Sequence, residues 1–186
     1  NQKINLLIQH LLDNKPIQYF FNYTYFKCLK IYLDQHVLIP RVETEGLVDL
    51  VSEEIIKNPI NNIIDIGTGS GCIAIYLANK FQIDVFAVDV CKNALNRARI
   101  NAKKHNVIIN FNILDVLKSE KFDKLPIFDV IVSNPPYVIP SEVCKNSNIY
   151  SEPNQAIFVP NQDPLIFYRA ICSFAKKNLK KSGIIF

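Results

Sequence analysis

The stretch Asn61-Asn62-Ile63-Ile64-Asp65-Ile66-Gly67-Thr68-Gly69-Ser70-Gly71 decides the fold, because it joins a buried strand to a glycine-rich turn. The apolar run at 61–66 predicts a strand, and apolar residues at helical spacing after the turn predict a helix. Alternating glycines let the backbone approach a ligand closely, and the turn directs helix N–H groups toward that ligand. The next predicted strand, 83–88, ends in Asp89, which follows the first glycine by 89 − 67 = 22 residues. At this separation an acid at the second strand end reaches a ribose diol.

The elements around this unit alternate between strand and helix, which is typical of a doubly wound, mostly parallel α/β sheet. Strands are expected at 61–66, 83–88, 107–113, 128–133 and 183–186, and helices at 3–13, 47–56, 73–78, 94–105 and 164–180. The runs 19–26 and 29–34 are dense in aromatic and β-branched residues and predict a hairpin or extended pair. Residues 117–127 are expected to form a polar connection, and 138–163 a long ordered loop over the site. The inward face of the last helix is expected to carry Leu165, Tyr168, Ile171, Cys172, Ala175 and Leu179.

A third acid, Asp115, follows the strand predicted at 107–113. At the end of a third adjacent strand its carboxylate can accept a hydrogen bond from an exocyclic amino group, and Val116 offers an apolar edge beside it. The alternative is a surface aspartate in a loop.

The tetrapeptide Asn134-Pro135-Pro136-Tyr137 follows the apolar strand 128–133. Proline fixes φ and cannot donate to a sheet ladder, so the two prolines end the strand and stiffen the backbone at its carboxyl end. The Asn134 oxygen and a neighbouring backbone carbonyl can each accept one hydrogen of a planar –NH₂ group, while the tyrosine ring stacks on its face. Taken alone, the tetrapeptide fits an ordinary Pro-Pro turn equally well.

The segment Pro40-Arg41-Val42-Glu43-Thr44-Glu45 precedes a predicted helix. Acids in the first turn suit the helix dipole, whereas a cation there does not, which indicates another role for Arg41. Without further context, a solvated arginine at a loop end is the favoured alternative.

The composition indicates about one globular domain and no metal centre. The 186 residues are 49% hydrophobic and 20% charged, and the net charge of +4 is too mild to indicate nucleic acid by itself. The five cysteines include no C-x-x-C pair and the three histidines are scattered, which argues against a disulfide framework and a zinc site. Neither a signal peptide nor an apolar run of spanning length is recognisable. We therefore expect a cytoplasmic monomer that binds neither a membrane nor, stably, nucleic acid, or an organelle-matrix protein whose targeting segment has been removed.

The glycine pattern also indicates the type of cofactor. Nicotinamide dinucleotides are typically bound by G-x-G-x-x-G, whereas Cys72 stands where the third glycine of that fingerprint would be. Together with the three acids Asp65, Asp89 and Asp115, the Gly67-x-Gly69-x-Gly71 turn looks like the S-adenosylmethionine pocket of Rossmann-like methyltransferases.

Four motifs in this order resemble the HemK/PrmC family of release-factor glutamine methyltransferases, over a stretch from about Pro16 to the last residue. They are Pro40-Arg41-x-Glu43-Thr44-Glu45, Asp65–Gly71, Ser133–Tyr137 and Glu152-Pro153. The resemblance implies transfer of a methyl group from S-adenosylmethionine to the glutamine side-chain amide in the Gly-Gly-Gln motif of class I peptide chain release factors. It implies cofactor-binding roles for Asp65, Gly67, Thr68, Gly69, Ser70, Gly71, Asp89, Asp115, Val116 and Asn134, catalytic roles for Asn134, Pro135 and Tyr137, and substrate-binding roles for Asn134, Pro135, Pro136, Tyr137 and Arg41.

The sequence also departs from the family pattern. Val42 replaces a second proline, and Pro160, Asn161 and Pro164 stand where glycines are expected. Residues 1–34 are expected to be a remnant of the family's N-terminal helical region plus a hairpin linker, and 35–186 a methyltransferase domain lacking its last strands. The chain contains no methionine, which predicts that it is a fragment.

Three alternatives remain open. The Asn-Pro-Pro-Tyr motif also serves exocyclic amines, so a methyltransferase acting on adenine or guanine is the nearest, although that activity predicts a basic face or a base-recognition domain. Methylation of a ribosomal-protein glutamine is the second, for which Pro-Arg-Ser-Pro is expected in place of residues 40–43. The third is a domain that binds the cofactor without turnover.

Overall fold

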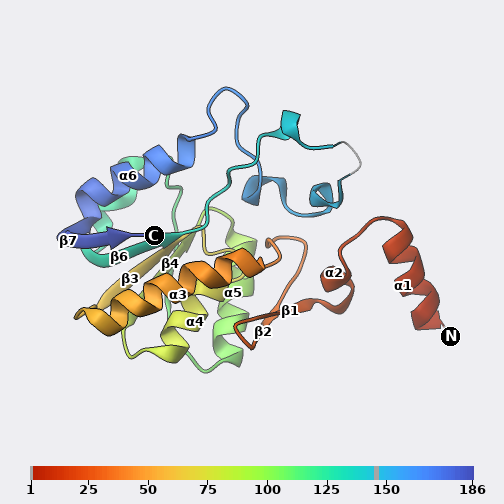
Figure 1. The fold of residues 1–186 in the computed structure, drawn as a ribbon, viewed down its shortest axis with the longest axis horizontal. Coiled ribbons are helices and arrows are strands. Elements are labelled where there is room, and N and C mark those ends of the chain that lie inside the picture. Colours follow the sequence, from red (N-terminus) through yellow and green to blue (C-terminus); the bar gives the residue numbers. More distant parts are fainter. Residues whose placement is uncertain (1, 145–146) are drawn as a thin grey trace.

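The computed structural model describes residues 2–144 and 147–186 and has a five-stranded parallel sheet at its centre (Figure 1). The strands are β3 (Asn62–Ile66), β4 (Asp84–Asp89), β5 (Asn110–Ile113), β6 (Phe128–Ser133) and β7 (Leu179–Ile185). Their order is β5-β4-β3-β6-β7, so the chain builds outward from β3 in one direction and then returns to the other side of β3 to form β6. This confirms the doubly wound prediction and puts a topological switch point between β3 and β6, where ligands bind in such folds.

Two apolar cores lie on opposite faces of the sheet, because successive side chains of a strand point to opposite sides. Helices α3 (Val42–Lys57) and α4 (Cys72–Lys80) cover one face, and α6 (Ile166–Asn178) covers the other (Figure 1). Helix α5 (Lys92–Lys104) packs beside β4 and β5. The first core contains Phe26, Ile31, Val48, Val51, Ile63, Leu77, Val130 and Val132, and the second contains Ile64, Val88, Phe128, Ile131, Ile171 and Phe174.

The N-terminal elements are α1 (Gln2–Leu12), α2 (Ile17–Phe21) and an antiparallel hairpin of β1 (Tyr23–Phe26) and β2 (Leu29–Tyr32). No residue of α1 is buried, and Figure 1 shows this helix standing apart from the sheet. The predicted hairpin is present, but the expectation that its first arm begins at residue 19 is wrong. Pro16 precedes a short helix and Asn22 ends it in the left-handed conformation, which are common start and stop signals.

Two predicted boundaries need correction at the other end of the chain. The last helix stops at Asn178 and β7 begins at the next residue, so the final strand is longer than 183–186. Asn178 is buried and its Nδ2 donates to the carbonyls of Phe122, Leu125 and Pro126. The buried positions of this helix are Ile171, Phe174, Ala175 and Asn178, whereas the expected Leu165, Tyr168 and Cys172 are exposed.

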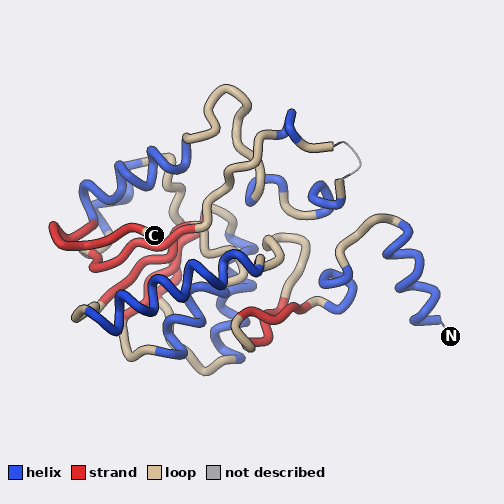
Figure 2. The backbone as a smooth tube through the Cα atoms, viewed as in Figure 1, coloured by secondary structure: helices blue, strands red, loops and turns tan. Residues whose placement is uncertain are grey.

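The connections also contain more structure than expected. The segment 117–127 includes a 3₁₀-helix, Ser119–Lys124, whose Phe122 packs edge-on against Phe174, so this connection is not purely polar. Figure 2 shows the path from β6 to α6 as a long loop interrupted by short helical turns. These are the 3₁₀-helices Pro140–Glu142, Asn148–Ser151 and Asn154–Ala156. The strand ends and this loop together position the candidate site.

Candidate active site

A cavity of about 260 Å³ lies at the carboxyl ends of the strands. Of the residues singled out from the sequence, those that line it are Gly67, Gly69, Asp89, Asp115, Val116, Asn134, Pro135 and Pro136. They lie at or just after the ends of β3, β4, β5 and β6, which are parallel and therefore end at the same edge of the sheet. The fold thus brings the glycine turn, two of the three acids and the Asn-Pro-Pro corner to one place.

The glycine turn is held in a conformation that needs glycine. Gly67, Gly69 and Gly71 all have positive φ angles, of 74°, 55° and 84°. A Cβ on Gly71 would lie 3.0 Å from Ile75 Cδ1 and 3.1 Å from Ala98 Cβ, so this glycine also lets α4 and α5 approach each other closely. The backbone N–H groups of Gly67 and Thr68 donate to the Val88 carbonyl at the end of β4. The turn is therefore anchored to the second strand rather than free.

Asp89 connects the turn to the cavity. Its Oδ2 accepts from the Gly69 backbone N–H at 2.9 Å and its Oδ1 from the Cys91 N–H at 2.8 Å. Burial raises the pKa of Asp89, against the effect of these backbone donors. Asp115 is held more loosely: its Oδ1 accepts from Leu117 N–H at 3.0 Å, and its other oxygen lies 3.3 Å from the exposed Lys118 ammonium.

Asp65 lies behind the turn, and neither it nor Thr68, Ser70 or Gly71 lines the cavity. The Thr68 hydroxyl donates to Asp65 Oδ2 at 2.6 Å, while no described residue donates a hydrogen bond to the buried Oδ1. Burial raises the pKa of Asp65 to about 7. Direct cofactor contacts by these four residues remain a prediction; in the structure Asp65 supports the turn from behind by accepting from the Thr68 hydroxyl.

The Asn-Pro-Pro corner follows β6 directly. Asn134 Nδ2 donates to the Thr44 hydroxyl oxygen at 3.1 Å, whereas no described residue donates to Asn134 Oδ1. Pro135 is buried beside it, and the preceding Ser133 hydroxyl donates to the Ile66 carbonyl at 2.7 Å. In this orientation the Asn134 amide oxygen remains available to accept a hydrogen bond from a ligand. Tyr137 is 59% exposed and does not line the cavity.

Arg41 has a specific partner. Its guanidinium lies 2.5 Å from Glu152 Oε1, and Glu152 Oε2 accepts from the Ile39 backbone N–H at 3.0 Å. The Glu152 side chain is only 4% exposed, and a buried carboxylate is costly unless it is paired and hydrogen-bonded. Here the guanidinium of Arg41 balances its charge and the Ile39 N–H donates a hydrogen bond to it. The pair joins the start of α3 to the long loop after β6. A role for Arg41 in substrate binding remains a prediction.

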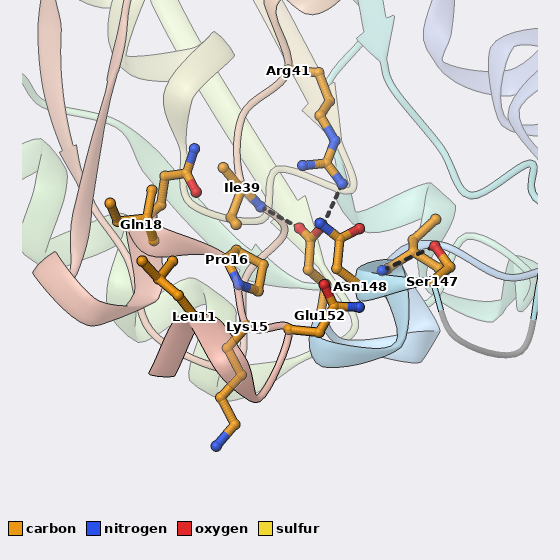
Figure 3. Close-up of a pocket in the computed structure, with 12 residues that line it drawn as sticks. Leu11, Lys15, Pro16, Gln18, Ile39, Arg41, Ser147, Asn148 and Glu152 are labelled. Carbon is orange, nitrogen blue, oxygen red and sulfur yellow. Dashed lines mark hydrogen bonds and ion pairs between the residues drawn. The ribbon is translucent and has the colours of Figure 1, made fainter. Parts of the chain in front are cut away.

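A second cavity, of about 630 Å³, lies beside this ion pair (Figure 3). Figure 3 shows Arg41 and Ile39 converging on Glu152, with Ser147 and Asn148 on one side and Leu11, Lys15 and Pro16 on the other. Although it is larger, this cavity contains neither the glycine turn, nor Asp89, nor the Asn-Pro-Pro corner. It is therefore not the place where the predicted chemistry comes together.

Several residues of the smaller cavity were not predicted from the sequence to have a cofactor-binding, substrate-binding or catalytic role. They are His36, Val37, Leu38, Ile66, Val90, Cys91, Ala94, Leu114, Leu117, Ser133, Gln155, Ala156, Phe167 and Ile171. Gln155 stands two residues after the Glu152-Pro153 motif, and this position could have marked it as a candidate residue of the cavity. Residues 36–38 carried no comparable signal, since only the packing of the segment after the hairpin brings them to the strand ends. Thr44 was part of a quoted motif, but nothing in the sequence indicated its contact with Asn134.

Neither a metal centre nor a membrane-spanning helix is found within residues 2–144 and 147–186. That part of the chain has no group of three or more His, Cys, Asp or Glu side chains arranged to hold a metal ion. It also has no helix both long and apolar enough to cross a membrane.

The parallel sheet, its glycine turn and the acid after the second strand define a Rossmann-like fold of the nucleoside-binding class. Comparison with known proteins makes this class more specific. Residues 44–150 match the family model described as "Methyltransferase small domain". Among solved structures, a putative caffeoyl-CoA O-methyltransferase from Staphylococcus aureus aligns with a TM-score of 0.52 at 16% identity, covering 99% of this chain and 71% of that one. This last likeness concerns the fold alone.

Closer relatives are found by sequence. The chain is 43% identical over 187 residues to the release factor glutamine methyltransferase of Flavobacterium psychrophilum, covering 97% of this chain and 65% of the relative. It is 40% identical over 193 residues to the corresponding protein of Lactococcus lactis subsp. lactis, covering 100% and 69%. The chain belongs to the release factor glutamine methyltransferase family, which confirms the resemblance seen in its motifs. It spans about two thirds of the length of these curated relatives.

Proposed function

We propose that this chain transfers a methyl group from S-adenosylmethionine to the side-chain amide nitrogen of the glutamine in the Gly-Gly-Gln motif of a class I peptide chain release factor. The observation that carries the proposal is the shared cavity. Its wall contains Gly67, Gly69 and Asp89 on the cofactor side and Asn134 to Pro136 on the acceptor side. The family membership supports the choice of this reaction.

The hydrogen-bonding groups on the cofactor side fit a nucleoside. Both Asp89 oxygens already accept one backbone N–H each, and a carboxylate oxygen has a second lone pair available for a ribose hydroxyl. No atom other than its own neighbours lies within 4 Å of a Cβ built on Gly67, so a ligand can approach this backbone closely. Asp115 and Val116 offer one acceptor and one apolar contact where an adenine ring would lie. S-adenosylmethionine, when bound, supplies an electrophilic methyl group on a sulfonium.

The acceptor side can orient a neutral amide. A carboxamide nitrogen is a poor nucleophile, because its lone pair is delocalised into the carbonyl group. The Asn134 Oδ1 and the Pro135 carbonyl are proposed to accept hydrogen bonds from its two N–H groups, which turns the lone pair toward the methyl group and favours positive charge developing on nitrogen. The nitrogen forms its bond to the methyl carbon as the bond from that carbon to sulfur breaks, and it then releases one of its two protons to water. Pro135 and Pro136 keep this corner rigid, and the exposed Tyr137 ring is free to stack on the amide plane. The proposed contribution is alignment and electrostatics rather than a strong base.

Methyl transfer from labelled S-adenosylmethionine tests the proposal. The acceptors compared are a Gly-Gly-Gln peptide from a class I release factor, the same peptide with glutamate in place of glutamine, double-stranded DNA, RNA and ribosomal protein. We expect label only in the glutamine peptide, because glutamate has no –NH₂ group. Label only in nucleic acid would replace the proposal with base methylation, label only in ribosomal protein would favour the sister activity, and cofactor binding without any transfer would indicate a binding domain.

The proposed partner is therefore a class I release factor, recognised as a protein substrate. We propose that the chain acts as a monomer in the cytoplasm and forms no stable complex with nucleic acid. A gel-mobility assay with the RNA and DNA used above checks for nucleic-acid binding, and sedimentation of the protein checks that it is a monomer.

A further inference from the structure

We propose that Thr44 is a positioning residue, whose hydroxyl oxygen holds the Asn134 amide so that its carbonyl oxygen faces the acceptor. This inference rests on the proposed function. The contact is direct, with Asn134 Nδ2 donating to Thr44 Oγ1 at 3.1 Å. Thr44 lies in the first turn of α3, only 7% exposed, and 90 positions from Asn134 in the sequence. It does not line the cavity, so it acts through the asparagine.

An asparagine needs such a partner. The terminal amide torsion is broad and roughly two-fold, so nitrogen and oxygen can exchange places at little cost. The group that receives the methyl, the glutamine side-chain amide of the substrate, also ends in –NH₂. If Asn134 turned its own –NH₂ toward it, two hydrogen-bond donors would face each other and no hydrogen bond could form. A threonine hydroxyl can donate as well as accept, so Thr44 fixes where the amide lies, and the observed orientation, with Nδ2 donating to Oγ1, is the one that leaves Oδ1 available to an –NH₂ group. In the described residues no other side chain forms a hydrogen bond with the Asn134 amide.

The turn that carries Thr44 is itself fixed on two sides. Arg41, three residues earlier, is paired with the buried Glu152. Glu45, the next residue, accepts from the Lys27 backbone N–H of the hairpin at 2.9 Å through its Oε1. The Thr44 backbone N–H donates to the Arg41 carbonyl within the turn. A side chain mounted on an element anchored in this way can hold a reacting group within a narrow range of positions.

The experiment compares Thr44→Val, Thr44→Ser and Ser52→Ala. Valine keeps the shape of threonine but cannot accept the hydrogen bond, whereas serine retains the hydroxyl. Ser52 is a matched control, since its buried hydroxyl donates within the same helix to the Val48 carbonyl at 2.6 Å. For Thr44→Val we expect kcat for transfer to the glutamine peptide to fall about 10- to 100-fold, as misplacement of a reacting group does, with the cofactor dissociation constant unchanged. Thr44→Ser should recover most of the loss, and Ser52→Ala should keep the full kcat.

A double-mutant cycle with Asn134→Ala separates positioning from a general effect on folding. If Thr44 acts only through Asn134, Thr44→Val causes no further loss once the asparagine is gone. Fully multiplicative losses would overturn the inference, as would a Thr44→Val protein with the wild-type kcat.

A second measurement does not depend on methyl transfer. The side-chain ¹⁵NH₂ signals of Asn134, assigned by their absence in Asn134→Ala, should shift and exchange faster with solvent in Thr44→Val but not in Ser52→Ala. Unchanged signals would overturn the inference even with an active enzyme. A wild-type protein that transfers no methyl group to the glutamine peptide would instead remove the proposed function, and the positioning role with it.

Discussion

The two sides of the cavity differ in how far apart in the sequence their hydrogen-bonded residues lie. On the cofactor side, Thr68 bonds Asp65 three residues away and Gly69 bonds Asp89 twenty residues away. On the acceptor side, Asn134 bonds Thr44 across 90 residues. Arg41, which precedes the same turn of α3, bonds Glu152 across 111 residues, beside the second cavity. The first side is a local strand-turn-helix-strand unit held largely by backbone N–H groups. The second is assembled from side chains of segments that meet only in the folded protein, so we expect it to be the more sensitive to changes elsewhere.

The largest expected effect falls on the acceptor side. Asn134→Ala should lower kcat for methyl transfer about 10²- to 10³-fold, the range for removing one group that stabilises a transition state. Cofactor affinity, measured by calorimetry, should change far less, because Asn134 is proposed mainly to orient the acceptor. An equal loss of transfer and cofactor binding would remove the distinction between the two sides.

The next effect tests the cofactor side. Asp89→Ala should weaken cofactor binding by roughly 1.5–3 kcal/mol, typical of hydrogen bonds to a charged group. Asp115→Ala should weaken it less, because Asp115 is more loosely held and faces the solvent-exposed Lys118. Titration calorimetry measures both. A dissociation constant unchanged by Asp89→Ala would exclude this carboxylate from the binding site.

A smaller effect concerns the connection between α3 and the long loop. Glu152→Gln should lower the free energy of unfolding by about 1–3 kcal/mol, since it removes a buried charge-assisted hydrogen bond from Arg41 while leaving an acceptor for Ile39 N–H. Asp13→Asn is the control, because its pair with Lys15 is exposed and such pairs contribute about 0–1 kcal/mol. Urea denaturation measures the two variants. Equal small losses would show that the connection contributes no more than a surface pair.

The last expected effect is a gradual pH dependence on the cofactor side. The folded-state pKa of Asp65, about 7, lies above its ordinary value of 3.8, because burial disfavours the charged form. Between these two values the unfolded chain is ionised while the folded protein holds a proton, so this group's contribution to stability falls as pH rises and is constant above about pH 7. The slope for one proton is at most about 1.4 kcal/mol per pH unit.

Asp65→Asn removes this titration, and asparagine can still accept from the Thr68 hydroxyl. The variant should therefore gain stability relative to wild type as pH rises from about 4 to about 7. Urea denaturation at several pH values gives the difference. A difference that is flat across this range would show that Asp65 is not held protonated by its surroundings.

The same contrast explains how much could be predicted from the sequence. The parallel sheet, its strand ends and the meeting of Gly67, Asp89, Asp115 and Asn134 follow from local patterns, because carboxyl ends of parallel strands share one edge. The helix at Ile17–Phe21 was missed, since its aromatic composition favours a strand and only its flanking Pro16 and Asn22 indicate otherwise.

The acceptor side could be predicted only in part. The tetrapeptide at 134–137 is recognisable, but the bonds of Asn134 with Thr44 and of Arg41 with Glu152 depend on how α3 packs against β6 and the long loop. The spacing of apolar residues in the sequence does not predict contacts of this kind. For the same reason the sequence does not show that Asp65 lies behind the turn while Asp89 lines the cavity.

The start of α3 bonds three distant segments: the N-cap residue Arg41 bonds the long loop, and in the first turn Thr44 bonds the end of β6 and Glu45 bonds the hairpin. All three residues lie within five consecutive positions, 41–45, at the point where the chain enters the helix. One residue inserted between Arg41 and Thr44 would rotate the later side chains by about 100° relative to the arginine. The number of residues in this turn is thus constrained as strictly as their identity.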